Sequence, residues 1–145
     1  MRNKSMKKIS YLFVIILAAA LVLLSACGGS EPEAVEEPES VTFNFVSTDE
    51  FKWNPASVTV QTGAEVNIVL ENQGALEHNW ILAREGVDVA TASDADALYG
   101  ANVGYVQGGE TGNLKFIAPG PGKYLYVCTV AGHAAGGMVG DFIVE

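Results

Sequence analysis

Three side chains that bind soft metal ions stand at even intervals near the end of the chain. Cys128, His133 and Met138 lie in the stretch CTVAGHAAGGM, with four residues between each of them and the next. A thiolate, an imidazole and a thioether form a soft donor set, which selects copper in preference to magnesium or calcium. The spacing therefore indicates a copper-binding loop.

Each of these residues also has a simpler explanation. A lone methionine entering a strand is usually part of the core, and a lone cysteine is often a small buried hydrophobe. The stretch itself is also consistent with a flexible glycine-rich connection. A nucleophilic pair of Cys128 and His133 is a further alternative, although the sequence indicates no third group to orient it. Core packing gives no reason for His133 to lie midway between the two sulfur residues.

The loop lacks one donor of a complete blue copper site, which needs a thiolate and two imidazoles in a plane with a weak thioether on the axis. The sequence contains two histidines, and the one outside the loop is His78. His78 begins the apolar segment 79–83, which we expect to be a strand. Two neighbouring strands of a sandwich can bring His78 against the loop, and the four donors of a blue copper site are then complete.

Alternation of apolar and polar residues predicts the elements that position these donors. Period two is typical of half-buried strands, and glycine, proline or asparagine bounds each such segment. About seven or eight short strands at this spacing indicate an all-β sandwich. The alternating segments are 41–46, 57–60, 66–70, 114–117 and 124–127, and segments 79–83 and 139–144 add two more expected strands. Residues 91–104 interrupt the pattern and predict a short helix or flap behind a Ser93 cap.

Several motifs of the chain resemble those of cupredoxins, the type 1 blue copper proteins. These motifs are Asn54-Pro55, the segment Glu77-His78-Asn79-Trp80 and the Cys-x4-His-x4-Met loop. Within the superfamily the loop spacing is most similar to that of auracyanins, and the likeness extends to azurins. Plastocyanins have a shorter gap between cysteine and histidine, and azurins a shorter gap between histidine and methionine.

The resemblance implies a cupredoxin-like Greek-key β-sandwich of about eight strands that holds one type 1 copper ion. It implies that His78, Cys128 and His133 are the equatorial ligands and that Met138 is the axial ligand. Cupredoxins of this kind carry single electrons between membrane complexes by Cu(I)/Cu(II) cycling, so the resemblance implies that function here. It also implies that the protein is not an enzyme, because both histidines are already used as ligands.

The same resemblance assigns roles next to the ligands. Asn79 follows the first ligand and is expected to hydrogen-bond the copper loop and steady the thiolate; the alternative is an ordinary strand-edge or turn residue. Glu77 stands where azurins have glycine, and its carbonyl is a candidate weak axial contact. Val130 and Ala131 replace the phenylalanine and proline that related loops often carry. The loss of a proline removes a backbone constraint, so we expect a more flexible loop.

The small residues around His133 predict how electrons leave the site. Alanine and glycine fill positions 131–137 apart from the histidine itself, and their side chains are too small to cover an imidazole edge. We therefore expect a flat apolar face at His133, where membrane redox complexes or cytochromes dock. Weak redox encounters bury little surface, so a small face is enough.

The first part of the chain is typical of an exported lipoprotein. Four basic residues precede the apolar run 9–24, and Leu24-Ser25-Ala26-Cys27 resembles a bacterial lipobox. We therefore expect a signal peptide at residues 1–26, a lipid on Cys27, an acidic tether over residues 27–40 and a copper-binding domain at residues 41–145. The alternative is an uncleaved transmembrane anchor, for which the run is slightly short. The expected location is extracytoplasmic and lipid-anchored to the cell membrane.

Removal of the signal peptide leaves four basic residues against seventeen acidic ones, a net charge of −13. This charge argues against nucleic acid or an anionic lipid surface as a partner, because both require basic patches. Cys128 then becomes the one cysteine of the folded domain, which excludes an internal disulfide and favours a metal ligand. We expect a monomer. An extracytoplasmic protein that stores or delivers copper remains the alternative function.

Overall fold

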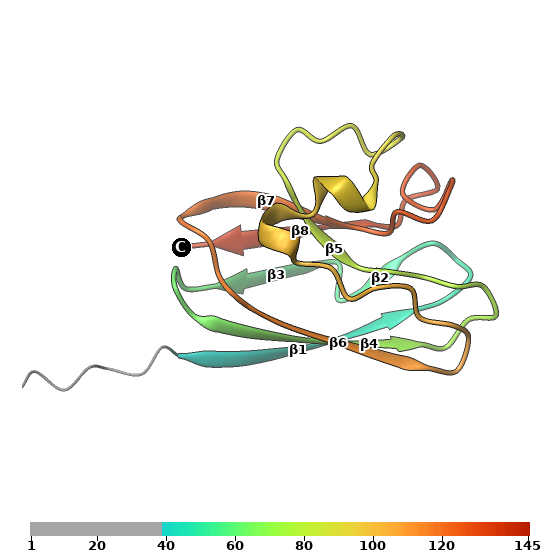
Figure 1. Ribbon diagram of the computed structural model, residues 1–145, viewed down its shortest axis with the longest axis horizontal. Helices are drawn as coiled ribbons and strands as arrows, with labels where there is room; N and C mark the ends of the chain where they lie inside the picture. The colour runs from blue at the N-terminus through green and yellow to red at the C-terminus, as the bar shows by residue number, and fades with distance from the viewer. Residues whose placement is uncertain (1–38) are drawn as a thin grey trace, which may run out of the picture. The chain divides into compact units, whose positions relative to one another are not determined.

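Alternating apolar residues build two four-stranded sheets that pack face to face (Figure 1). The computed structural model describes residues 39–145. One sheet has the order β2-β1-β4-β6 and the other the order β3-β8-β7-β5. The strands are β1 (Ser40–Ser47), β2 (Trp53–Asn54), β3 (Ser57–Val60), β4 (Glu65–Asn72), β5 (Ile81–Arg84), β6 (Thr111–Ile117), β7 (Gly122–Val127) and β8 (Val139–Val144).

The predicted all-β Greek-key sandwich of about eight strands is confirmed. Strands β1 and β4 pair in parallel, as do β3 and β8, because their connections cross between the sheets. The sequence pattern missed β2, which has two residues and is therefore too short to show a period. The expected signal peptide, the lipidated Cys27 and almost all of the tether lie outside the described residues. Within residues 39–145, no helix is long and apolar enough to cross a membrane.

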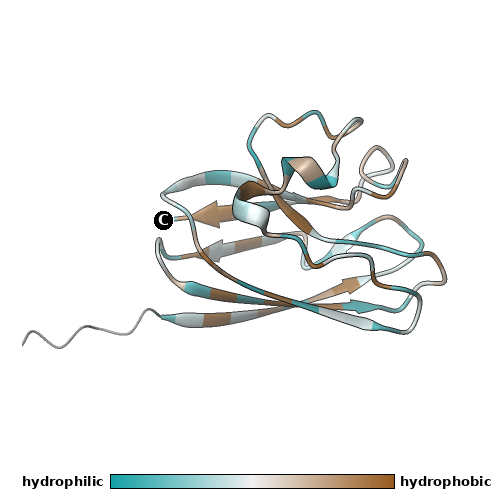
Figure 2. Cartoon of the chain, viewed as in Figure 1, coloured by the Kyte–Doolittle hydropathy of each residue, from teal (hydrophilic) through white to brown (hydrophobic). Residues whose placement is uncertain are grey.

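Aromatic rings fill the space between the two sheets. Figure 2 shows hydrophobic and hydrophilic residues alternating along the strands, as burial of one face requires. Trp80 stacks on Tyr126 with ring centroids 5.7 Å apart, and Phe45 contacts both rings. Trp80 comes two residues after His78, and Tyr126 comes two residues before Cys128. The core therefore anchors both chain segments that carry donors.

Strand β5 is covered on both faces, which explains why its sequence does not alternate. Ile81 and Ala83 point away from the main core and form a second buried cluster with Val127 and Ala134. Segment 87–97 packs over this cluster with partly buried apolar side chains. The predicted flap is thus the cover of an outer sheet face.

The flap contains two short 3₁₀ helices, Asp94–Asp96 and Leu98–Gly100, in place of one helix. Ser93 caps the first of them, as predicted. Its backbone N–H donates to the Asp96 carboxylate at 2.9 Å, and its hydroxyl donates to the same oxygen at 3.0 Å. The cap leaves the neighbouring Asp94 carboxylate free to bind elsewhere.

The loops that follow β1, β4 and β7 meet at one end of the sandwich (Figure 1). They comprise residues 48–52, residues 73–80 and residues 128–138. The ends of strands from both sheets meet there, so residues far apart in the sequence become neighbours. All four predicted copper ligands come from these loops.

Candidate metal centre

Backbone hydrogen bonds fix His78 ahead of strand β5. The His78 N–H donates to the Val106 carbonyl at 3.1 Å, and the Val106 N–H donates back to the His78 carbonyl at 2.7 Å. The buried Asn72 supports this pair, since its amide donates to the carbonyls of Val106 and Leu76 at 2.9 and 2.7 Å. Strand β5 begins at Ile81, two residues later than expected, so an isolated bridge rather than a strand holds His78.

The loop of residues 128–138 folds back on itself through backbone hydrogen bonds. The Cys128 N–H donates to the Met138 carbonyl at 3.1 Å, and the Met138 N–H donates to the His133 carbonyl at 3.0 Å. Gly132 and Gly137 have positive φ angles of 84° and 112°, which explains glycine at these two turns. These bonds fix the loop, which the sequence predicted to be flexible, without the usual proline.

The structure brings three of the predicted donors together. The Nδ1 atoms of His78 and His133 lie 3.2 Å apart, and Cys128 Sγ lies 3.5 Å from His133 Nδ1. All three donor atoms lie within 4.8 Å of one another, and all three residues are buried. Met138 is also fully buried and belongs to the same core cluster as Cys128.

These separations fit one bound metal ion. Nitrogen and sulfur ligands lie about 2.0–2.3 Å from a bound ion, so neighbouring donors are about 3–4 Å apart. One thiolate with two imidazoles is a donor set that suits copper, and the closed, buried cluster excludes the water ligands that hard cations retain.

Asn79 links the first histidine to the loop that carries the cysteine. Its side-chain oxygen accepts a hydrogen bond from the Thr129 N–H at 2.7 Å, and its amide donates to the Thr129 hydroxyl at 2.7 Å and to Asp94 at 2.9 Å. The Asn79 backbone N–H points to Cys128 Sγ at 3.5 Å. Asn79 therefore contacts the loop with its side chain and the sulfur with its main chain.

The turn between β1 and β2 contacts both histidines, which sequence reasoning missed. The ring of Phe51 packs on the ring of His133 at 4.4 Å between centroids. An Asp49 oxygen lies 3.8 Å from Nε2 of His78. Phe51 has a positive φ of 56°, which is uncommon for a bulky residue. The sequence of the turn gives no sign of this backbone conformation, so the contacts of the turn with the histidines could not be predicted.

The imidazole edge of His133 is less exposed than the small loop residues predicted. The side chain is 6% exposed, because Phe51 covers one face of the ring. A Cβ atom at Gly136 would lie 2.9 Å from the Phe51 ring, so glycine there makes room for phenylalanine. The carboxylate of Glu77 accepts a hydrogen bond from Gln107 at 2.9 Å, and the axial contact expected of the Glu77 carbonyl stays a prediction.

Burial keeps the donors neutral in the metal-free protein. Burial raises the pKa of the Cys128 thiol, although hydrogen bonds from the backbone of Asn79 and Val130 act in the opposite direction. Burial lowers the pKa of both histidines, and the charge of His133 lowers that of His78 further. Neutral imidazoles bind metal directly, whereas the thiol must release a proton as it binds.

The lowered histidine pKa values predict that the metal-free protein loses stability as the pH falls from 7.5 to 5.5. Histidine in the unfolded chain titrates near 6.5, and the folded protein binds these protons only at lower pH. The unfolded state therefore binds more protons in this window, which lowers the free energy of unfolding. Urea unfolding at both pH values measures the effect. In the double variant His78→Gln/His133→Gln we expect a weaker dependence, and an equal dependence would contradict the assignment.

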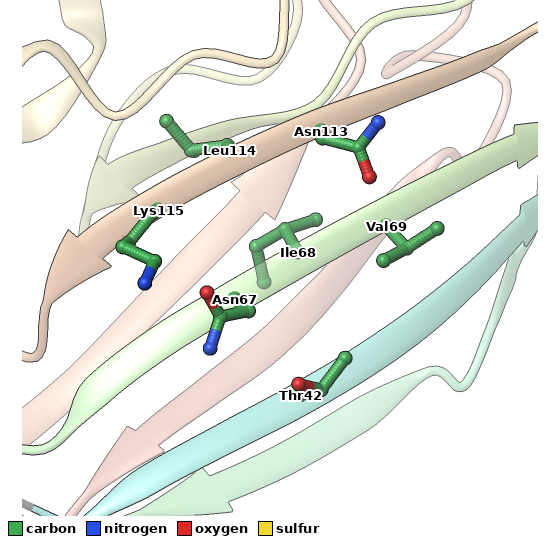
Figure 3. Close-up of a pocket in the computed structure, with 7 residues that line it drawn as sticks. All are labelled: Thr42, Asn67, Ile68, Val69, Asn113, Leu114 and Lys115. Carbon is green, nitrogen blue, oxygen red and sulfur yellow. The ribbon is translucent and has the colours of Figure 1, made fainter.

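A shallow depression elsewhere on the surface shares no residue with the donor cluster. It lies over the β1-β4-β6 sheet and is lined by Thr42, Asn67, Ile68, Val69, Asn113, Leu114 and Lys115 (Figure 3). Its one charged lining residue, Lys115, pairs with Glu65 at 2.8 Å. Among the described residues, the cluster of metal-binding side chains therefore lies at the loop end of the sandwich, away from this depression.

Comparison with known proteins agrees with the geometry of the site. Residues 40–145 match the model of the family described as copper binding proteins, plastocyanin/azurin family. The chain is 32% identical to Auracyanin-B of Chloroflexus aurantiacus in an alignment of 145 positions that covers 88% of this chain and 61% of that protein. It is 30% identical to the copper-resistant cuproprotein CopI of Rubrivivax gelatinosus in an alignment of 109 positions that covers 72% of this chain and 66% of that protein. The chain thus spans less than two thirds of the length of either relative.

A solved structure is similar over the whole sandwich. Auracyanin A, described as a "blue" copper protein from Chloroflexus aurantiacus, superposes with a TM-score of 0.60 at 31% identity. The match covers 73% of this chain and 99% of the auracyanin chain. The family match extends over all eight strands and over every donor. The chain therefore belongs to the plastocyanin/azurin family of copper-binding proteins.

Proposed function

We propose that His78, Cys128, His133 and Met138 hold one copper ion with which the protein carries single electrons between redox partners. The observation that carries this proposal is the convergence of one cysteine and two histidines from two loops far apart in the sequence, with their donor atoms within 4.8 Å. The likeness to auracyanins supports the same function. In this role Met138 provides the weak axial thioether, for which its buried place beside Cys128 is suitable.

Copper supplies a one-electron couple, and the protein supplies a site that changes little between the two states. The three donor atoms lie within 4.8 Å of one another, so one copper ion can bind all three with little rearrangement. Cys128 is 0% exposed, so the fold excludes water and other ligands from the sulfur. Hydrogen bonds around the sulfur tune the potential of such sites, and the Asn79 N–H is one such donor here.

A redox titration tests the proposed function. The copper-loaded protein is expected to show an intense visible band, which ascorbate bleaches and an oxidant restores over repeated cycles. Copper content measured after each cycle is expected to stay at one ion per chain. A colourless copper adduct, or loss of copper on reduction, would instead support the second candidate, a storage or delivery protein. The likeness to CopI, named for copper resistance, is the observation in favour of that candidate.

Electrons enter and leave near His133 in this proposal. The histidine is 6% exposed within a loop whose exposed neighbours, residues 131–132 and 135–137, are all alanine or glycine. A membrane-bound redox complex or cytochrome docks on this face, with a small contact area. Ala135→Glu places a charge there and is expected to slow electron transfer to the native partner about tenfold or more, because burying an unpaired charge opposes docking. Ala90→Glu, on the exposed segment after β5, is the control, and equal rates in both variants would refute docking at His133.

The chain acts outside the cytoplasm in this proposal, tethered to the membrane by a lipid on Cys27. The support is the lipobox-like Leu24-Ser25-Ala26-Cys27 after an apolar run. The acidic residues that follow provide a solvated tether that lets the copper domain reach membrane partners. Mass spectrometry of the protein from its own membranes tests this assignment: a diacylglycerol-sized addition on Cys27 is expected, and an intact residue 1–26 segment would contradict it.

Asn79 steadies the copper loop in this proposal, and its replacement has a measurable cost. Asn79→Ala removes three side-chain hydrogen bonds and leaves the Thr129 N–H without its acceptor. We expect a loss of roughly 2–3 kcal/mol in the free energy of unfolding, at about 1 kcal/mol per bond. Urea unfolding measures it, with Asn113→Ala on the exposed face of β6 as the control. A similar small effect in both variants would show that Asn79 has only an edge-residue role.

A further inference from the structure

We propose that Asp49 is a positioning residue of the copper centre, whose carboxylate orients the His78 ring and favours the oxidised metal ion. The inference rests on the proposed function, since it takes His78 as a ligand. It concerns a residue of the β1–β2 turn, nearly thirty positions before that histidine. Four observations on this turn support it.

The first observation is an unpartnered nitrogen. Nδ1 of His78 faces Nδ1 of His133 at 3.2 Å, whereas Nε2 is buried and has no hydrogen-bond partner among residues 39–145. A histidine that binds metal through Nδ1 carries its proton on Nε2, and ligating histidines almost always donate that proton to a carboxylate, a carbonyl or water. Asp49 Oδ1 lies 3.8 Å from this nitrogen. The proposed contact requires this separation to shorten to hydrogen-bond length, at most about 3.2 Å.

The second observation is that the carboxylate is held in place. The Ala75 N–H points to both carboxylate oxygens at 3.0 Å, and the Leu76 N–H donates to Oδ1 at 3.1 Å. These donors belong to the segment that leads directly into His78. Gly74 leaves room for this carboxylate, because a Cβ atom at that position would collide with the Asp49 carboxylate. The loop before the ligand is thus shaped around Asp49.

The third observation is that the same turn contacts the second histidine. Phe51 packs on His133 with a 33° angle between the ring planes. Phe51 holds this position with a φ of 56°, and residues in such conformations persist where the surrounding structure requires them. One five-residue turn therefore contacts the outer side of both imidazoles.

The fourth observation is the sign of the charge. A carboxylate beside a ligand ring attracts Cu(II) more strongly than Cu(I), because the oxidised ion carries the greater positive charge. Asp49 therefore lowers the reduction potential of the site. The carboxylate is 45% exposed, so solvent screens part of this effect.

The test compares Asp49→Asn with Glu50→Gln in the copper-loaded protein. Both variants remove one negative charge from the same turn, but Glu50 is exposed and makes no side-chain contact with the donor cluster. We expect the reduction potential to rise in both, and by clearly more in Asp49→Asn. Asp49→Ala, which also loses the acceptor, is expected to bind Cu(II) about 10–100-fold more weakly.

A proton NMR measurement on the Cu(I) protein distinguishes positioning from a purely structural role. The Nε2–H of His78 is expected as a downfield, slowly exchanging signal in the wild type and in Glu50→Gln, and to shift upfield or exchange rapidly in Asp49→Ala. Equal potentials in Asp49→Asn and Glu50→Gln, or a wild-type protein without this signal, would overturn the inference. A wild-type protein without thiolate-to-copper absorption would instead overturn the proposed function. If an Asp49 variant does not fold, the presence or absence of the His78 Nε2–H signal in the wild-type protein still tests the inference.

Discussion

Replacing Cys128 by serine is expected to abolish the intense visible band of the copper-loaded protein. The band requires charge transfer from a thiolate, and a serine hydroxyl is a harder donor that stays protonated at neutral pH. The side chain is fully buried, so no other thiol replaces it, and within residues 39–145 it is the one cysteine. Reversible one-electron cycling is expected to disappear with the band. Absorption spectroscopy after addition of one equivalent of Cu(II) measures the effect.

Met138→Leu is the matched control for this substitution. Leucine has a similar volume, so the buried position remains filled. An axial thioether binds weakly, so the variant is expected to keep the visible band while its reduction potential changes. If Cys128→Ser kept the band, or if Met138→Leu lost it, the assignment of equatorial and axial donors would be wrong.

Replacing Trp80 by alanine is expected to cost about 3–5 kcal/mol in the free energy of unfolding, which is typical of large-to-small changes in a core. The side chain is 0% exposed and packs against Phe45, Tyr126 and Phe116, at 5.7, 5.7 and 6.2 Å between ring centroids. Its loss leaves a cavity beside the chain segments that carry His78 and Cys128. Urea unfolding of the metal-free protein measures the cost.

Tyr99→Ala is the control for this stability prediction. Tyr99 is 84% exposed on the second 3₁₀ helix, so its removal is expected to change stability by less than about 0.5 kcal/mol. A loss of under about 1 kcal/mol for Trp80→Ala would show that the aromatic cluster does not hold the two donor segments together.

The sequence predicted the donors because their chemistry is local and their number is small. Cys128, His133 and Met138 stand in one loop, and a chain with two histidines leaves His78 as the remaining imidazole. Alternation likewise predicted five of the strands, because burial of one sheet face imposes period two on the sequence. The prediction of Asn79 as a contact of the loop depended on a family resemblance, since its partner Thr129 lies fifty residues away.

The residues that support the donors were not predictable in the same way. Asp49 and Phe51 contact the histidines only because the β1–β2 turn folds over the end of the sandwich. Asn72 supports the histidine by donating hydrogen bonds to the carbonyls of Leu76 and Val106. A buried asparagine at the end of a strand has no distinctive sequence pattern that would predict this role. The sequence predicted Asp94 only as a residue of the flap. In the structure its carboxylate accepts hydrogen bonds from Asn79 and Thr129, which connect the flap to the copper loop.

X-ray absorption at the copper edge of the fully loaded protein tests the central claim most directly. The donor cluster of His78, Cys128 and His133 predicts one short copper–sulfur contact and two imidazole nitrogen contacts, with one copper ion per chain. The sulfur contact is expected to disappear in Cys128→Ser, while nitrogen contacts remain. A wild-type spectrum with only oxygen and nitrogen neighbours, or with more than one copper ion per chain, would contradict the proposed site.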